Sequence, residues 1–257
     1  MEKSSFLLGG INMLEEFDRY VSNYDLSIDC LKRKYNHSIR VMNLSVKYAR
    51  LLGFNDDDIE LASIIGLLHD IGRFEQYTKY KSFNDYENID HADYGVKVLF
   101  DDGLIKKFTN RVKDYDLIRY AISNHNKLKI EKTDNKRYIK FVNLIRDVNK
   151  LDTVYLTGYL WEYKFAANGE YISDNVRKCF ELKKAINRRE IVNNNDNLAV
   201  SFAFVFDINN DVILKEFRQN IYYFYKRIGG VNIFRDIYNE VIRYIDERID
   251  KNVREEI

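Results

Sequence analysis

The sequence predicts an all-α protein. Apolar residues recur along it with the 3.6-residue period of helices, whereas alternation with a period of two is scarce. The 257 residues include no proline, the commonest helix breaker, so long helices can run without interruption. A hydrophobic fraction of 46% is ample for a packed core. The sequence contains no internal repeat and no Gly/Ser linker, so we predict one continuous helical domain over residues 1–257.

The first strongly predicted helices deliver a His-Asp pair. A helix is predicted over residues 31–52, because His37 continues its apolar stripe and Gly53 then supplies a stop. The next helix begins at Asn55, a typical N-cap, and three aspartates follow where the helix dipole favours them. This helix is apolar around most of its circumference, which indicates a central, buried element. It ends at His69 and Asp70, with Gly72 just beyond.

A polar and aromatic segment follows, from Phe74 to Ile89, and we predict a loop there. Loops of this length commonly serve as lids or binding loops. Asp90 then has the character of an N-cap, which places His91 in the first turn of a further helix. The helix after that carries His125 at the end of the stripe begun by Ile118.

The later helices are predicted from their apolar stripes over residues 138–152, 214–228 and 234–245. The run of asparagines at residues 193–197 is either a polar loop or a helix start. The last two stripes are expected to pack on the first part of the chain or on a second subunit. A homodimer formed through these C-terminal helices is therefore one expectation.

The composition limits the classes of partner. Lys plus Arg number 41 and Asp plus Glu number 40, and this balance argues against a dedicated nucleic-acid binder. Two cysteines, Cys30 and Cys179, do not make a disulfide framework in so long a chain, which favours reduced thiols. No apolar stretch approaches the ~20 residues that a membrane-spanning helix needs. We therefore expect a soluble, cytoplasmic protein without membrane association.

The histidines carry the strongest functional signal. The chain has four, and each ends or continues an apolar helical stripe, so all of them are expected to point inward to a common place. Imidazole and carboxylate are good ligands for divalent transition metals, and separate helices can supply them to a bundle core. A lone histidine on such a stripe is more often a hydrogen-bonded core residue. Four of them, with Asp70 directly after His69, favour a metal site in which Asp70 bridges two ions.

Four motifs in order along the chain carry a family resemblance. They are residues 35–41 (YNHSIRV), 69–76 (HDIGRFEQ), 90–92 (DHA) and 124–125 (NH), followed by the segment 146–152 (RDVNKLD). Together they resemble the HD-domain superfamily of metal-dependent phosphohydrolases, and more narrowly a bacterial subgroup of it. The resemblance implies an HD-domain helical bundle with additional C-terminal helices, in which the metal-site core spans about residues 30–155 and the helical extension about 156–257. It also implies a metal-dependent phosphohydrolase that acts on a nucleotide or another small phosphate ester through metal-activated water.

The resemblance further implies a set of metal ligands for one or two divalent ions, of Mn, Fe, Co, Ni or Zn, with Mg also allowed. These ligands are His37, His69, Asp70, His91, His125 and Asn149. Position 149 departs from the family, which has an aspartate there. An asparagine can coordinate through its carbonyl oxygen but is neutral and weaker, and Asp152, one turn further on, could substitute for it.

Substrate contacts are expected from the cations of the matched motifs. Lys150 and Arg73 would hold the phosphate, and Arg40 could help, although a solvated helix charge is an equal interpretation. Glu75 and Gln76 would bind the attacking water or the substrate, or only shape the loop. Asp70, as bridging ligand and proton acceptor, is the best catalytic candidate beside Lys150 and Arg73. Two other functions stay open: an oxygen-using di-iron enzyme, and a non-catalytic nucleotide-binding or regulatory module with a degenerate site.

Overall fold

Helices form nearly all of the regular structure in the computed structural model, which describes residues 7–8, 11–160, 171–229 and 232–255. The all-α prediction is therefore confirmed. The exception is a small antiparallel hairpin of β1 (Leu7–Leu8) and β2 (Ile11–Asn12). Contacts divide the chain into two compact units, Met1–Ile145 and Arg146–Ile257. The single domain over residues 1–257 stays a prediction, and part of its extension, residues 161–170, lies outside the described residues.

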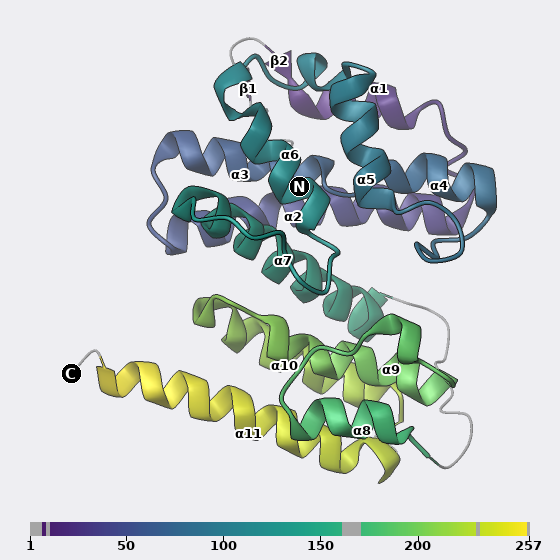
Figure 1. Ribbon diagram of the computed structural model, residues 1–257, viewed down its shortest axis with the longest axis vertical. Coiled ribbons are helices and arrows are strands. Elements are labelled where there is room, and N and C mark those ends of the chain that lie inside the picture. Colours follow the sequence, from purple (N-terminus) through teal and green to yellow (C-terminus); the bar gives the residue numbers. More distant parts are fainter. Residues whose placement is uncertain (1–6, 9–10, 161–170, 230–231, 256–257) are drawn as a thin grey trace. The chain divides into compact units, whose positions relative to one another are not determined.

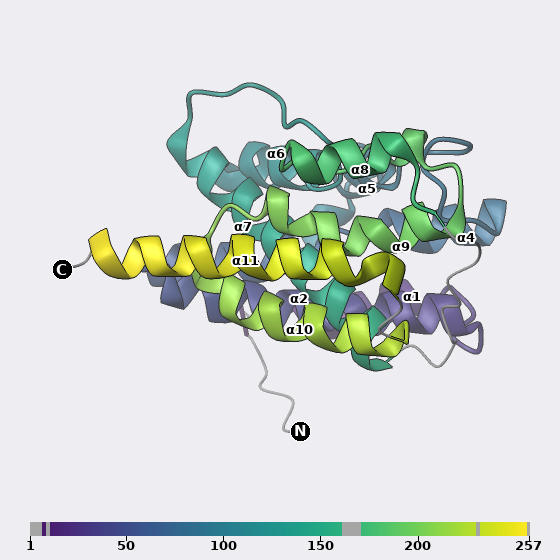
Figure 2. The same cartoon turned by 90° about the horizontal axis from the view of Figure 1, so that it is seen from below.

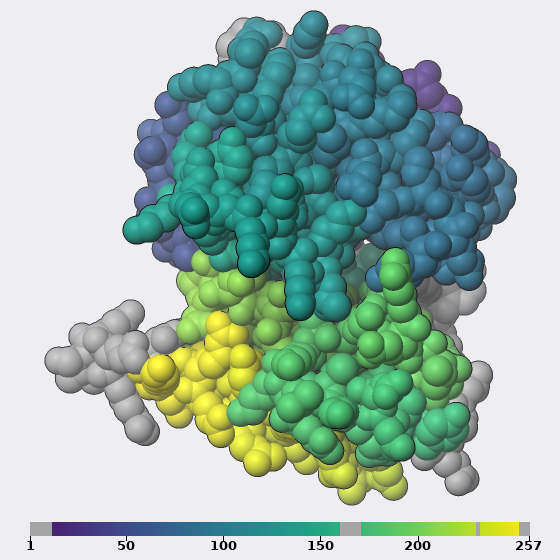
Figure 3. Space-filling view, in the orientation of Figure 1, coloured from purple at the N-terminus to yellow at the C-terminus, as the bar shows by residue number. Residues whose placement is uncertain are grey.

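In its described residues, the first unit has six helices and the start of a seventh, joined in part by short π-helical and 3₁₀ turns (Figure 1). They are α1 (Met13–Val21), α2 (Asp29–Leu51), α3 (Asp56–Leu68), α4 (Gly72–Tyr80), α5 (His91–Val96), α6 (Tyr115–Asn124) and the first part of α7 (Lys136–Tyr155). In the space-filling view, the blue segment that contains α4 and α5 lies beside the teal segment that contains α6 (Figure 3).

Helix α3 is the central element of this unit, as its all-round apolar character predicts. Every residue from Leu61 to Leu68 is buried. The side chain of Asn55 caps its N-terminus by accepting a 2.8 Å hydrogen bond from the Asp58 backbone N–H. α3 packs closely on α2 at Gly66, where a β-carbon would lie 2.5 Å from Ser45 Oγ. This close approach brings the C-terminal end of α3 beside α2.

The predicted loop from Phe74 to Ile89 is wrong in its first half, where α4 runs from Gly72 to Tyr80. The polar composition conceals a short helix whose inward face carries Phe74, which is fully buried and contacts the rings of Phe17, Tyr20 and Tyr24. Gly72 begins this helix instead of ending the previous one. The helix ends at Lys81 in the left-handed conformation, φ 52°, and only residues 81–90 form the loop.

The second unit contains the predicted C-terminal helices (Figure 2). Its helices, after the end of α7, are α8 (Asp174–Glu181), α9 (Asn194–Ala203), α10 (Leu214–Arg227) and α11 (Asn232–Glu255). The asparagine run is a helix start, because Asn193 caps α9 through the backbone N–H of Asp196. The rings of Phe202, Phe224 and Phe234 pack together in the core of this unit. Among the described residues, no helix has the length and apolar character needed to cross a membrane.

Candidate metal centre

The four histidines converge in the first unit from four different elements. His37 lies on α2, His69 follows the last residue of α3, His91 begins α5, and His125 follows the last residue of α6. Each is at most 3% exposed. Asp70 lies among them and is equally buried. The structure thus brings together all the first-unit residues that the sequence suggests as metal ligands.

The carboxylate of Asp70 divides the histidines into two pairs, one for each oxygen. On the Oδ2 side, His37 Nε2 and His69 Nε2 lie 3.5 and 3.7 Å from the carboxylate and 3.2 Å from each other. We call these two histidines the first pair. Asp70 and the first pair form one group of three potential ligands whose donor atoms all lie within 4.8 Å of one another.

On the Oδ1 side, His91 Nε2 and His125 Nε2 lie 3.0 and 3.6 Å from the carboxylate. These two nitrogens lie 3.0 Å from each other and form the second pair. The second pair and Asp70 make the other group of three potential ligands. Asp70 belongs to both groups, so its position is that of a bridging ligand.

Hydrogen bonds at the far side of the rings fix their tautomers. His69 Nδ1 lies 2.8 Å from the carbonyl oxygen of Gly66, and His125 Nδ1 lies 2.6 Å from that of Ile122. A carbonyl oxygen can only accept, so Nδ1 carries the hydrogen in both rings. The Nε2 lone pair of each neutral ring is therefore directed at the centre, as in metal-bound histidines.

His91 has a different outer partner, the carboxylate of Asp85. Its Nδ1 lies 2.8 and 2.9 Å from the two carboxylate oxygens, so Nδ1 carries a hydrogen here as well. The bare Nε2 atoms of neutral His91 and His125 would repel each other at 3.0 Å. A positive charge between them is required, either a shared proton or a metal ion. Two nitrogens that bind one ion at 2.0–2.1 Å lie about 2.9–3.4 Å apart, so the spacing fits a metal.

The protonation states also suit metal ligation. Burial lowers the pKa of His69 and of His125, which keeps both rings neutral. Burial acts to raise the pKa of Asp70, but the positive charge of Lys34 and the neighbouring histidines outweigh it and hold that pKa well below its usual range. Neutral imidazoles around an ionised carboxylate are the ligand forms that a divalent ion binds.

Lys34 is a member of the site that the sequence analysis missed. Its Nζ lies 2.7 Å from Asp70 Oδ2, the oxygen that faces the first pair. The side chain is 24% exposed, and burial lowers the pKa of its ammonium group. Its place on α2, one turn before His37, is the only sequence signal that could have indicated it.

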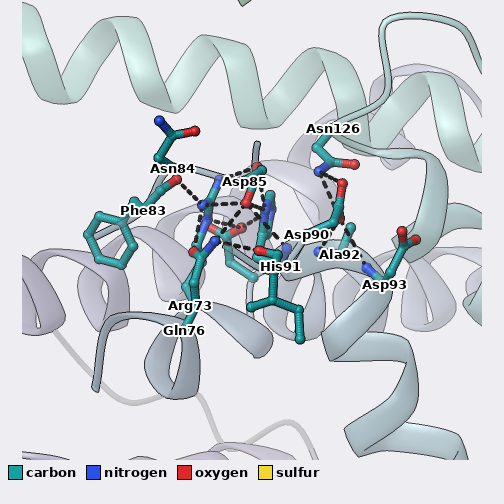
Figure 4. Close-up of polar contacts among 12 residues, drawn as sticks. Arg73, Gln76, Phe83, Asn84, Asp85, Asp90, His91, Ala92, Asp93 and Asn126 are labelled. Carbon is teal, nitrogen blue, oxygen red and sulfur yellow. Dashed lines mark hydrogen bonds and ion pairs between the residues drawn. The ribbon is translucent and has the colours of Figure 1, made fainter. Parts of the chain in front are cut away.

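Asp85 is the second missed residue, and it joins the loop to the site (Figure 4). Arg73 Nη1 donates to Asp85 Oδ1 at 3.0 Å, and Gln76 Nε2 donates to the same oxygen at 2.8 Å. Burial acts to raise the pKa of Asp85, but His91 and Arg73 hold it below its ordinary value. Arg73 also bonds the carbonyl of Phe83, and its Nε lies 3.7 Å from Asp70 Oδ1. Arg73 and Gln76 therefore hold the loop beside the centre.

Asp90 holds the start of α5 against the segment that follows α6. It caps α5, as predicted, by accepting from the backbone N–H groups of Ala92 and Asp93. Its carboxylate also accepts from Asn126 Nδ2 at 3.1 Å (Figure 4). Lys127 Nζ donates to the same carboxylate at 2.9 Å. Asp90 precedes His91, and Asn126 follows His125, so these contacts fix the backbone next to both members of the second pair.

The other predicted site residues have varied surroundings. Arg40 is half-buried on α2, and Glu75 accepts a 3.4 Å hydrogen bond from the Tyr24 hydroxyl. Asn149 and Lys150 lie on the part of α7 that belongs to the second unit. There, Lys150 Nζ lies 2.9 Å from Asp207 Oδ2. The roles of these four residues at the metal centre stay predictions.

The alternative ligand Asp152 is also in the second unit, where it is buried. The neighbouring Asp147 has a different role, because it accepts hydrogen bonds from the backbone and side-chain amides of Asn209 and Asn210. Asp147 thus anchors a turn within its own unit.

Comparison with known families gives one result. The family model described as HD domain matches residues 35–154, a range that includes all four histidines and Asp70. No match was found among curated proteins, and none among solved structures.

Proposed function

Since this chain belongs to the HD-domain superfamily through residues 35–154, we propose that it is a metal-dependent phosphohydrolase of nucleotides or other small phosphate esters. The observation that carries the proposal is the arrangement around Asp70, whose two oxygens face two separate pairs of buried histidines. A bridging carboxylate between two imidazole pairs suits two neighbouring divalent ions, and such ion pairs are typical of phosphoester hydrolysis.

The donor atoms favour transition metals. Four imidazole nitrogens and one carboxylate suit Mn, Fe, Co, Ni or Zn, whereas Mg prefers oxygen ligands and retains several waters. When bound, such ions lower the pKa of a coordinated water towards 7 and offset negative charge on phosphoryl oxygens.

The side chains of the protein would hold the metal ions in place and supply charge to bind the phosphate. Asp70 stays ionised and can join the two ligand groups. Lys34 contacts Asp70 and has a partly exposed side chain, so it could move from Asp70 to a phosphate oxygen of the substrate. Arg73 lies close to Asp70 and offers a second cation, although it is engaged with Asp85. Lys150 completes the proposed phosphate contacts through its place in the matched motif.

A panel of substrates and metals tests this function. The metal-free protein would be supplied separately with Mn, Co, Ni, Mg and Fe, and assayed with phosphomonoesters, phosphodiesters and nucleotides. We expect turnover with at least one transition metal, and none in a His69→Ala, Asp70→Ala double variant. Nucleotide binding without turnover by any metal form would contradict the proposal and favour a regulatory module. Oxygen consumption by the iron form, without hydrolysis, would favour a di-iron oxygenase.

A further inference from the structure

We infer that Asp85 is a positioning residue that selectively sets the affinity of the second pair, His91 and His125, for its metal ion. The loop of residues 81–90 would thereby decide whether the centre holds one ion or two. This inference rests on the proposed function, because it concerns the same metal centre.

His91 differs from the other histidines of known tautomer in the origin of its outer partner. His69 and His125 donate from Nδ1 to carbonyl oxygens of their own helices, three residues earlier. His91 begins its helix, so no earlier turn of that helix can offer a carbonyl oxygen. The carboxylate of Asp85 takes that place, at 2.8 Å from Nδ1. The orientation of His91 therefore depends on a loop residue.

Asp85 is itself held firmly by several hydrogen bonds. Besides the His91 ring, its carboxylate accepts from the His91 backbone N–H at 3.2 Å and from Gln76 Nε2 at 2.8 Å. The guanidinium of Arg73 donates to both of its oxygens, at 3.0 and 3.3 Å. Gln76 also donates to the carbonyl of Ile89 at 2.7 Å, near the end of the loop. Arg73 and Gln76 thus act on the metal centre through Asp85.

The outer carboxylate also affects how strongly the histidine binds a metal ion. A carboxylate that accepts the outer N–H of a ligand histidine fixes its ring and tautomer and makes the metal-binding nitrogen more basic. Loss of such a partner typically lowers metal affinity by about 10–100-fold. The two histidines of the first pair lie outside this loop, since His37 is on α2 and His69 is at the end of α3. The effect of Asp85 should therefore fall on one ion position.

The test is a Co²⁺ titration of the metal-free full-length protein, monitored by calorimetry and by the visible d–d absorption of Co²⁺. For the wild type we expect two Co²⁺ ions. Asp85→Asn keeps the shape of the side chain and removes its charge, and we expect one Co²⁺ affinity to fall about 10–100-fold while the other is unchanged. The spectrum of the weakened position should change as well. Glu87→Gln removes an exposed carboxylate from the same loop and should match the wild type.

Asp85→Glu guards against a purely structural effect. It retains the carboxylate and should restore part of the lost affinity, and thermal unfolding of each metal-free variant would show that it is folded. Two unchanged Co²⁺ affinities in Asp85→Asn would overturn the inference and leave the proposed function intact. An equal loss at both positions, or a single Co²⁺ site in the wild type, would also overturn it. A wild type that binds no metal at all would refute the metal centre itself.

Discussion

His91 and His125 present their Nε2 atoms to each other at 3.0 Å, although each ring already donates from its Nδ1 to another acceptor. Two neutral rings held in this way have only lone pairs to offer across the gap. The arrangement is stable only with a positive charge between the nitrogens. A metal ion would satisfy both nitrogens and Asp70 Oδ1 at once, whereas a proton shared by the two rings would need no metal.

Metal removal should therefore destabilise the protein. An ion that binds only the folded state adds about 2.7 kcal/mol at a free concentration of one hundred times its dissociation constant. For a chain of this size we expect each 1 kcal/mol to shift the thermal midpoint by about 2–4 °C. Calorimetry with Co²⁺ and with a chelator would measure the difference. A thermal midpoint that neither treatment changes would support a shared proton in place of the metal ion.

A second prediction concerns Lys34, which is 2.7 Å from Asp70 Oδ2. In metal-free Lys34→Met, a buried carboxylate loses its ammonium partner, so the free energy of unfolding should fall by about 1–3 kcal/mol. With Co²⁺ bound, the same change removes a positive charge next to the ion, so metal affinity should rise. Urea unfolding and Co²⁺ titration measure the two effects.

Lys32→Met is the matched control, because Lys32 is an exposed lysine on the same helix. We expect it to change neither the stability nor the metal affinity. If Lys34→Met bound Co²⁺ more weakly than the wild type, the expectation that the Lys34 ammonium group repels the bound ion would be wrong.

The sequence predicts those features of this site that depend on residues close together in the chain. The caps Asn55 and Asp90 were predictable, since each acts on backbone groups two or three residues away. The inward direction of the histidines was predictable too, because each shares a stripe with apolar residues that must be buried. These are properties of single helices, which the capping residues and the apolar periodicity indicate.

The missed features depend on contacts between separate elements. Asp85 lies in a polar loop, and nothing local indicates that its carboxylate meets His91 and Arg73. Lys34 is one lysine among many until α3 brings Asp70 beside it. Helix α4 was missed because its burial depends on contacts with α1 and the segment after it, which pattern reasoning within one segment does not detect.

A third prediction concerns Gly72, which lets α4 and α5 approach closely. A β-carbon there would lie 2.2 Å from the His91 carbonyl oxygen and 2.8 Å from Gly95 N, both backbone atoms. Gly72→Ala should therefore displace the start of α5, cost about 1–3 kcal/mol of stability and weaken metal binding by the second pair. Thermal unfolding and Co²⁺ titration would measure both.

Gly95→Ala provides the comparison on the other side of the same contact. Its β-carbon would lie 3.3 Å from Ile71 Cγ2 and 3.4 Å from Gly72 N, which small shifts can accommodate. We expect a clearly smaller loss of stability and of metal affinity. Equal effects of the two substitutions would argue against the close approach at Gly72 as the cause.

A fourth prediction concerns acid stability, through Asp114. This buried carboxylate accepts from Arg111 Nε at 2.9 Å and Arg137 Nη1 at 2.8 Å. Burial acts to raise its pKa, but hydrogen bonds from the two arginines outweigh this effect and hold it below the ordinary value of 3.8. Its stabilising contribution is therefore present at neutral pH and is lost as the pH falls through the folded-state pKa.

Asp114→Asn should lower the free energy of unfolding at neutral pH and flatten its decrease below about pH 5. Urea unfolding of the metal-free protein across this range measures the change. Asp116→Asn alters an exposed aspartate nearby and should keep the wild-type pH dependence. An Asp114→Asn variant with the same slope as the wild type would refute this assignment.

The last prediction concerns Asn149, where the HD-domain family has an aspartate. A carboxylate binds a divalent ion more strongly than a neutral amide oxygen, because it adds a full negative charge. Asn149→Asp should therefore raise metal affinity, by about tenfold or about 1.4 kcal/mol. Asn143→Asp introduces the same charge earlier on α7 and should leave the affinity at the wild-type value.

Metal analysis of the three purified proteins, followed by Co²⁺ titration, shows whether residue 149 is a metal ligand. If Asn149→Asp and the wild type both lack bound metal and take up no Co²⁺, the metal centre is refuted. If both bind Co²⁺ with equal affinity, position 149 contributes no ligand, and the four histidines and Asp70 hold the metal without it.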